Sequence, residues 1–283
     1  MTFRVGSRTV RPGSVLIWLL ALLLAAISTA PTIWAALTSF KSFIEANAKP
    51  PVWIPDFYRW SNYIDQFGPG GKAFGPLLNS LIVATGTMMV TMAVAIPAAY
   101  ALARYRLRRK KDIQFWIISS RMMPLIAAIV PLSTMLVWLN LNDSLPGLVI
   151  VYVAFNLSIA VWLLTIFFSN VPVEIEEAAR IDGVSRVGVL WHITFPLARA
   201  GLVVISIFTW IFSWNELLAA IVVTTGKTQT LPVFLSGFAS NNMTEYEKLA
   251  AVGVVQVIPA IVIVFFAQRY IVSGLSMGAV SGE

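Results

Sequence analysis

Residues 169–201, SNVPVEIEEAARIDGVSRVGVLWHITFPLARAG, form a long polar interruption in a strongly apolar chain. The pattern predicts two short amphipathic helices, with glutamates at the start of the first, where the helix macrodipole favours negative charge. Glu176 and Arg180 have the i, i+4 spacing of a helical ion pair. Gly183 is expected to end this helix in the left-handed conformation, and Ser185 to cap the next one. Apolar runs lie on both sides of the segment, so it is expected to connect two membrane helices.

The composition indicates an integral membrane protein. Apolar residues make up 58% of the chain and charged residues 12%, against about 25% charged in soluble domains. The net charge is +7, but the basic residues do not share a face with stacking aromatics, so we expect no nucleic-acid partner. The chain has no cysteine and a single histidine, His192. Disulfides and thiolate sites are therefore excluded, and we expect neither a metal site nor a cofactor.

Six apolar runs are long enough to cross a bilayer at about 1.5 Å per residue. The predicted fold is all-α and polytopic, with transmembrane helices at residues 15–37, 76–103, 113–138, 148–168, 202–223 and 250–270. Residues 1–14 and 271–283 are expected to be tails, and 38–75 a polar loop. The first run resembles a signal peptide, but Pro31 follows the small-residue site and the run continues beyond it. We therefore expect an uncleaved anchor.

The distribution of basic residues predicts the orientation. With six spans both ends lie on one side, and the segments on that side hold thirteen Lys and Arg residues. The opposite loops hold six, and Arg121, within a span, completes the total of 20. The positive-inside rule places both termini and the 169–201 segment in the cytoplasm.

Part of the polar segment resembles the EAA loop of binding-protein-dependent ABC importer permeases. The matching residues are Glu177, Ala178, Ala179, Asp182, Gly183, Ile193 and Pro196. Residues 98–104 (AAYALAR), 214–218 (WNELL) and 274–280 resemble the sugar-transporting branch of that family, and 120–124 its sugar-alcohol members. The resemblance begins near residue 73, which suggests an importer core at 73–270 that contains the loop at 169–201.

This resemblance implies a type I ABC importer permease in a bacterial or archaeal inner or plasma membrane, importing a sugar or sugar alcohol. It implies a second permease, two cytoplasmic ATPase subunits and an extracytoplasmic solute-binding protein as partners, beside membrane lipid. The EAA loop would dock on the ATPase, with Glu177 facing a basic residue there. Gly226-Lys227-Thr228 looks like the end of a phosphate-binding loop, but Ile221 stands where that loop needs glycine. The chain itself is therefore not expected to be an enzyme.

Polar residues within the predicted spans leave two interpretations open. A charge at the bilayer centre costs about 2.5–3.5 kcal/mol on insertion scales, so Arg121 and Glu216 should face the bundle interior or water. They could line the translocation path or a gate, or they could pair structurally between helices. We predict a mainly structural or gating role for both, with Asn215 beside Trp214 as the better substrate-facing candidate.

Other classes of transporter and an enzyme remain as alternatives. An ABC importer for an amino acid or phosphate would also carry an EAA loop, but 214–218 and 274–280 speak against it. A secondary transporter would need its own coupling-ion site and no EAA loop. An intramembrane enzyme would need a nucleophile–base pair or a metal cluster, and none stands out in the sequence.

Overall fold

The computed structural model describes residues 3–5, 8–10, 12–238 and 245–279. The chain divides into two units, which are described separately. The first contains residues 1–71 and 238–257, and the second contains residues 72–237 and 258–283.

The first unit contains a long apolar helix and a structured loop. Its elements are β1 (Phe3–Val5), β2 (Arg8–Val10), α1 (Pro12–Thr38), α2 (Phe43–Ala46), α3 (Ser61–Phe67) and the beginning of α14 (Tyr246–Ala279). β1 and β2 pair antiparallel, so the expected tail at 1–14 instead holds two short strands and the first turn of α1. The predicted first span is confirmed as a helix, and it includes Pro31.

The loop after α1 is more ordered than a polar connection requires. The Asn62 amide donates to the carbonyls of Ser39 (2.8 Å) and Lys41 (2.9 Å). Lys41 is only 1% exposed, and its Nζ lies 3.8 Å from the centroid of the Trp34 ring. Burial lowers the pKa of Lys41, since desolvation penalises the charged ammonium. These contacts hold the loop against the end of α1.

Glu45 caps α2 within the same loop. Its carboxylate accepts from the backbone N–H of Ser42 (2.6 Å) and of Asp56 (2.9 Å), while the Ser42 hydroxyl accepts from the Glu45 N–H. The bonds from Ser42 and Asp56 to the ionised carboxylate lower the pKa of Glu45 to about 2. Trp53 and Trp60 are 72% and 64% exposed, as expected of indole rings at a membrane surface.

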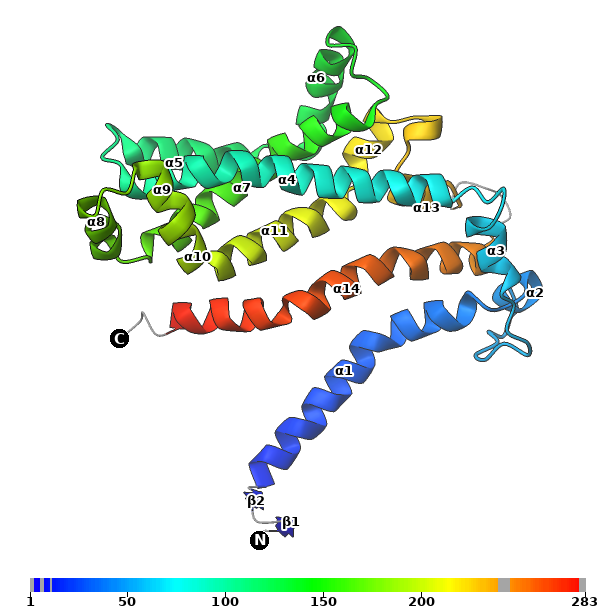
Figure 1. Ribbon diagram of the computed structural model, residues 1–283. Coiled ribbons are helices and arrows are strands. Elements are labelled where there is room, and N and C mark those ends of the chain that lie inside the picture. Colours follow the sequence, from blue (N-terminus) through cyan, green and yellow to red (C-terminus); the bar gives the residue numbers. More distant parts are fainter. Residues whose placement is uncertain (1–2, 6–7, 11, 239–244, 280–283) are drawn as a thin grey trace. The chain divides into compact units, whose positions relative to one another are not determined.

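The second unit is built around α4 and α7, which lie side by side, with α11 packed against both (Figure 1). Its helices are α4 (Phe74–Arg104), α5 (Lys110–Ser119), η1 (Ser120–Met122), α6 (Leu125–Trp138), α7 (Leu145–Ser169), α8 (Val173–Ile181), α9 (Arg186–Val189), η2 (Leu190–Thr194), α10 (Phe195–Leu197), α11 (Arg199–Trp214), α12 (Leu218–Val223), η3 (Gly226–Thr228), α13 (Leu231–Phe238) and the rest of α14.

Small residues allow the three central helices to approach closely. Ala95 and Ala99 of α4 and Ala160 of α7 are fully buried in a common core, together with Ile205 of α11. A Cβ at Gly201 in α11 would lie 2.3 Å from ring atoms of Phe167 in α7, so this contact requires glycine or a shift of the ring. Such small-residue seams are typical of helix packing in membranes, where apolar burial alone gives little drive for association.

Two of the predicted spans are not continuous helices. Among the described residues, four helices by themselves satisfy the length and composition of a membrane span: Leu16–Thr38, Phe74–Arg104, Leu145–Ser169 and Tyr246–Gln268. The run predicted at 113–138 is divided between Lys110–Met122 and Leu125–Trp138, which meet at 94°. Pro124, which has no N–H to donate, stands at the break. The prediction of one continuous helix at 113–138 was therefore wrong.

The fifth and sixth predicted spans also have different bounds. α11 ends at Trp214, residues 215–217 are not helical, and α12 begins at Leu218, so the run at 202–223 is interrupted. α11 also meets the preceding Arg186–Leu197 segment at 82°. α14 continues to Ala279, through most of the residues expected to form a tail. Residues 280–283 lie outside the described residues.

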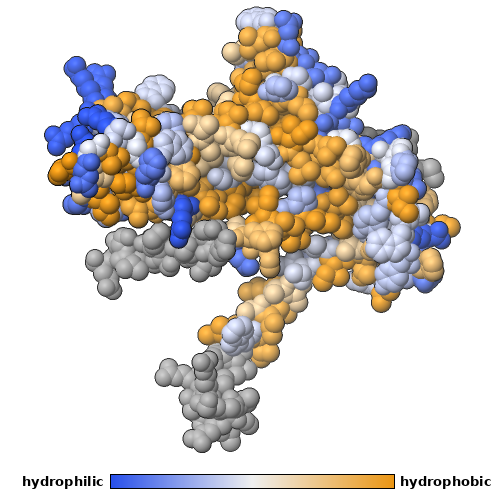
Figure 2. Space-filling view, viewed as in Figure 1, coloured by the Kyte–Doolittle hydropathy of each residue, from blue (hydrophilic) through white to orange (hydrophobic). Residues whose placement is uncertain are grey.

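The two ends of the second unit gather different loops. At one end, Asp143 accepts from the N–H and the hydroxyl of Thr225 (both 2.8 Å) and from the hydroxyl of Thr228, and these bonds lower the pKa of Asp143. The Asn79 amide at the start of α4 donates to the carbonyl of Lys227 (2.8 Å). The other end carries α8 and α9, and Figure 2 shows polar side chains collected there beside a mostly apolar flank. Loops predicted to share one side of the membrane therefore lie together.

Candidate functional site

α8 and the turn after it form the segment predicted to be a coupling loop. α8 follows Pro172, carries Glu174 and Glu176 in its first turn, and ends at Ile181. Gly183 then has φ +90°, a conformation that L side chains rarely adopt. The Ser185 hydroxyl accepts from the Gly188 N–H (3.1 Å) and caps α9. The predicted helix, glycine turn and serine cap are all confirmed.

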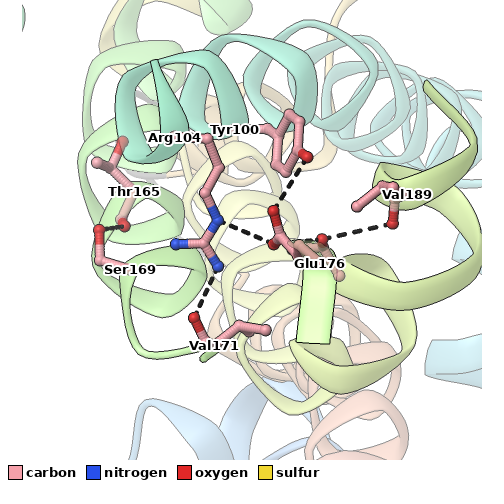
Figure 3. Close-up of polar contacts among 8 residues, drawn as sticks. Tyr100, Arg104, Thr165, Ser169, Val171, Glu176 and Val189 are labelled. Carbon is pink, nitrogen blue, oxygen red and sulfur yellow. Dashed lines mark hydrogen bonds and ion pairs between the residues drawn. The ribbon is translucent and has the colours of Figure 1, made fainter. Parts of the chain in front are cut away.

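Glu176 anchors this loop to the body of the unit. Its carboxylate accepts from Arg104 Nε (2.8 Å), from the Thr194 hydroxyl (2.7 Å) and from the Tyr100 hydroxyl (3.2 Å). Arg104 Nη2 also donates to the Val171 carbonyl (2.7 Å), so the guanidinium binds both Val171, which precedes α8, and Glu176, which lies within it (Figure 3). The side chains of Arg104 and Glu176 are 10% and 6% exposed. The loop is therefore joined to the end of α4 by a buried, charge-assisted network.

The ion pair expected within the helix is not the one that forms. Glu176 and Arg180 were expected to pair at i, i+4, but Glu176 is buried and turned toward Arg104, whereas Arg180 is exposed. Sequence reasoning missed Arg104 because it lies 72 residues away from Glu176. A signal was present, since Tyr100 and Arg104 stand one helical turn apart in the 98–104 run.

The seven EAA residues differ in their exposure. Glu177, Ala178, Asp182, Gly183 and Pro196 are exposed, Ile193 is half-buried, and Ala179 is buried. Thus α8 faces inward with Glu176 and Ala179 and presents Glu177 and Ala178 outward. The segment before Pro196 contains a π-turn, η2, whose Leu190 and Thr194 are buried.

The polar residues predicted at depth fall into two groups. Arg121 and Glu216 both line one cavity of about 330 Å³, also bounded by Tyr152 and Asn156 of α7. Among the described residues the ion pairs are Arg104–Glu176 and Lys248–Glu245, so Arg121 and Glu216 share the cavity without forming a salt bridge. Arg121 instead donates to the Phe155 carbonyl (2.7 Å).

Glu216 also caps the next helix. Trp214 and Asn215, which precede it, do not line this cavity. The Glu216 carboxylate accepts from the N–H groups of Ala219 (3.0 Å) and Ala220 (3.3 Å) and caps α12. Trp214 is 1% exposed and stacked on Trp210, with ring centroids 4.9 Å apart. The Asn215 amide donates to the Ile211 carbonyl (2.9 Å) on the exposed surface.

Comparison with known families identifies the chain. Residues 91–277, about two-thirds of it, match the family described as the binding-protein-dependent transport system inner membrane component. The chain belongs to this permease family. Its membership agrees with the EAA resemblance and with the apolar helices, and it makes the chain a multi-pass membrane permease.

Individual relatives can be aligned with this permease over most of its length. The trehalose transport system permease protein SugB of Mycobacterium tuberculosis is 33% identical over 89% of the chain and 92% of that protein. The sulfoquinovosyl glycerol transport system permease protein SmoH of Agrobacterium fabrum is 31% identical over 89% and 88%. A crystal structure of a bacterial ABC transporter involved in the import of the acidic polysaccharide alginate contains a similar chain, with TM-score 0.77, 23% identity and coverage of 95% and 99%. The fold is thus that of a type I ABC importer permease.

Proposed function

We propose that this permease imports a carbohydrate, either a sugar or a sugar alcohol. It forms the translocation pathway with a second permease, is driven by two separate ATPase subunits, and receives its cargo from an extracytoplasmic solute-binding protein. The names of SugB and SmoH support a carbohydrate substrate. The binding-protein-dependent family supports the solute-binding partner.

The observation that carries this proposal is the two-sided arrangement of α8. Glu177 and Ala178 are exposed and free to enter a cleft on an ATPase, while Glu176 is fixed to Arg104 at the end of α4. A displacement of the outer face is therefore passed to α4 through the hydrogen bonds of Arg104 with Glu176 (2.8 Å) and with the Val171 carbonyl (2.7 Å). We assign Glu177, Ala178, Ala179, Asp182, Gly183, Ile193 and Pro196 to the coupling element.

The orientation follows from the same assignment. An ATPase that uses cytoplasmic ATP must meet α8 in the cytoplasm, and the basic run after α4 lies at this end of the unit, since α4 ends at Arg104. Both termini are then cytoplasmic, in agreement with the excess of Lys and Arg in those segments.

Reconstitution of the transporter tests the proposal. The chain, its partner permease, the ATPase and the binding protein are assembled in proteoliposomes, and uptake of sugars and ATP hydrolysis are measured together. We expect sugar-loaded binding protein to stimulate hydrolysis, and Glu177→Ala to abolish both stimulation and uptake without preventing membrane insertion. Glu174→Ala, an exposed glutamate of the same helix, serves as the matched control.

Two outcomes would contradict the proposal. Normal uptake by Glu177→Ala would remove the coupling role of the loop. Uptake confined to amino acids or phosphate would retain the coupling role but reject the carbohydrate. We also expect the purified chain alone to lack ATPase activity. Steady hydrolysis by the pure chain would refute the assignment of ATP hydrolysis to separate subunits.

A further inference from the structure

The break in the third predicted span opens space at the middle of α7. The 330 Å³ cavity with Arg121 and Glu216 is lined by Tyr152, Phe155 and Asn156 of α7. A second cavity of about 280 Å³ shares Arg121 and Phe155 with it. Tyr152 and Ser158 lie roughly 10 and 20 Å along α7, which is about 37 Å long at 1.5 Å per residue. The two cavities therefore flank Arg121 near the centre of a membrane span.

The guanidinium of Arg121 retains hydrogen-bonding capacity in this space. Arginine has five N–H donors, and Arg121 uses Nη1 on the Phe155 carbonyl. The group is exposed and lies 5.9 Å from the centroid of the Phe212 ring, which is itself 45% exposed. An aromatic face and a planar donor thus border the same cavity.

Asn156 provides an independent sign of a missing partner. The residue is 5% exposed, its amide nitrogen donates to the Tyr152 carbonyl (2.8 Å), and its Oδ1 has no hydrogen-bond partner among the described residues. A buried acceptor without a partner costs free energy. Asn156 lines the cavity, so an incoming hydroxyl or water can satisfy this oxygen.

The charges of the cavity favour a neutral, hydroxyl-rich ligand over an anion. Arg121 contributes one positive charge, and Glu216, although it caps α12, contributes one negative charge with lone pairs to spare. A volume of about 330 Å³ falls at the lower end of small-molecule sites. Donor, acceptor and aromatic face together suit a single sugar ring or an open-chain polyol.

We propose that this cavity is a substrate subsite in the permease. Arg121 donates to the hydroxyls of one sugar or sugar-alcohol unit, Phe212 packs against its C–H face, and Asn156 and Glu216 accept from it. This assigns Arg121 to the translocation path, in place of the mainly structural role expected from sequence, and it places Asn215 off that path. The inference rests on the proposed function, because a carbohydrate must pass through this subunit for the subsite to be used.

The test uses the complete transporter in proteoliposomes with radiolabelled trehalose, maltose and sorbitol. For Arg121→Gln and Phe212→Leu we expect kcat/KM for uptake to fall about tenfold or more, as the loss of a hydrogen bond to a charged group or of an aromatic contact does. Preference among the sugars should change, while hydrolysis stimulated by the binding protein stays near the wild-type rate. Arg108→Gln and Phe265→Leu, exposed and outside this cavity, are the matched controls.

A second measurement does not depend on turnover. The chain has no native cysteine, so Phe212→Cys can be labelled with a thiol reagent and followed on the band of this subunit. Saturating sugar, with binding protein and ATP, should slow the labelling of Phe212→Cys and leave that of Met122→Cys unchanged.

Each failure identifies a different error. A wild-type transporter that takes up an amino acid or phosphate and none of the three sugars overturns the proposed function, and the subsite with it. Normal uptake and preference in the Arg121 and Phe212 variants overturn the subsite alone. Uptake and hydrolysis that fall in parallel at unchanged preference, without protection of Phe212→Cys, identify a gate or an assembly contact and likewise overturn it.

Discussion

Replacement of Arg104 by methionine should loosen the coupling loop far more than its position at the end of α4 suggests. The substitution leaves Glu176 in a site where its side chain is only 6% exposed, without its positive partner, and it also removes the donor to the Val171 carbonyl. Breaking a buried ion pair from one side costs about 3–5 kcal/mol. The Tyr100 and Thr194 hydroxyls remain as donors, so we expect a value near the lower limit.

Limited proteolysis measures this local stability. Arg180 and Arg186 are exposed trypsin sites within the loop. Cleavage requires local opening, so its rate follows the population of the open form when reclosing is fast. A loss of about 3 kcal/mol corresponds to roughly a hundredfold faster cleavage at these sites. Glu174→Gln removes an exposed glutamate from the same helix and should leave the rate unchanged.

The double variant gives the most specific result. Arg104→Met with Glu176→Gln leaves no unpaired buried charge, so it should be cleaved more slowly than Arg104→Met alone, although it carries one more substitution. If the two residues act as partners, the effects of their single substitutions should differ from the effect of the double variant by a coupling energy of about 0.5–3 kcal/mol. A double variant whose loss of stability equals the sum of the two single losses would contradict this. Cleavage of Arg104→Met at the rate of Glu174→Gln would refute the anchoring role altogether.

Three further predictions concern other parts of the chain. Gly183→Ala forces a Cβ onto a residue at φ +90° and should cost about 1–2 kcal/mol of loop stability, measured as faster tryptic cleavage. Gly183→Asn should cost less, because asparagine tolerates this conformation. Equal cleavage rates for the two variants would contradict backbone strain at this position. The folded-state pKa of Glu45 is about 2, below its ordinary value of 4.5, so its contribution to stability is present above pH 4.5 and is lost as the pH falls toward 2. The Tm in detergent should therefore fall over that range in the wild type and less in Glu45→Gln, and identical pH profiles would refute the capping role. In intact cells Lys227→Cys should react with an impermeant thiol reagent and Arg108→Cys should not, and the reverse pattern would overturn the orientation.

Local features of the coupling loop could be predicted because their causes lie within a few residues. A glycine after a helical run requires little beyond its own neighbours, and Gly183 has the expected positive φ. A serine placed three residues before Gly188 can cap α9 by itself. The partner of Glu176 depended on how α4 and α8 pack, and spacing along one helix pointed to Arg180 instead of Arg104.

The shape of the membrane helices was harder to predict for a related reason. Apolar composition fixes the length of a run, but not whether its backbone remains continuous. Pro124 and the polar pair Asn215 and Glu216 marked the positions of the two interruptions, but they do not give the angle of 94° at which the two parts of the third run meet. The cavity at Arg121 is lined by residues from three separate runs of the chain, so Tyr152 and Asn156 could not be predicted as its walls from the pattern of any one run.

The π-turn at η2 makes the length of the coupling loop as important as its composition. Each residue of an α-helix advances the chain by about 100°, and a π-turn accommodates one extra residue within a helical segment. Because the turn absorbs that residue, deletion of one residue from Leu190–Thr194 would let it close as an α-turn and keep Pro196 near its present phase relative to α9, whereas insertion of a further residue would rotate Pro196 and the start of α11 by about 100°. The segment should thus tolerate the loss of one residue better than the gain of one, because only an added residue turns the helix that follows.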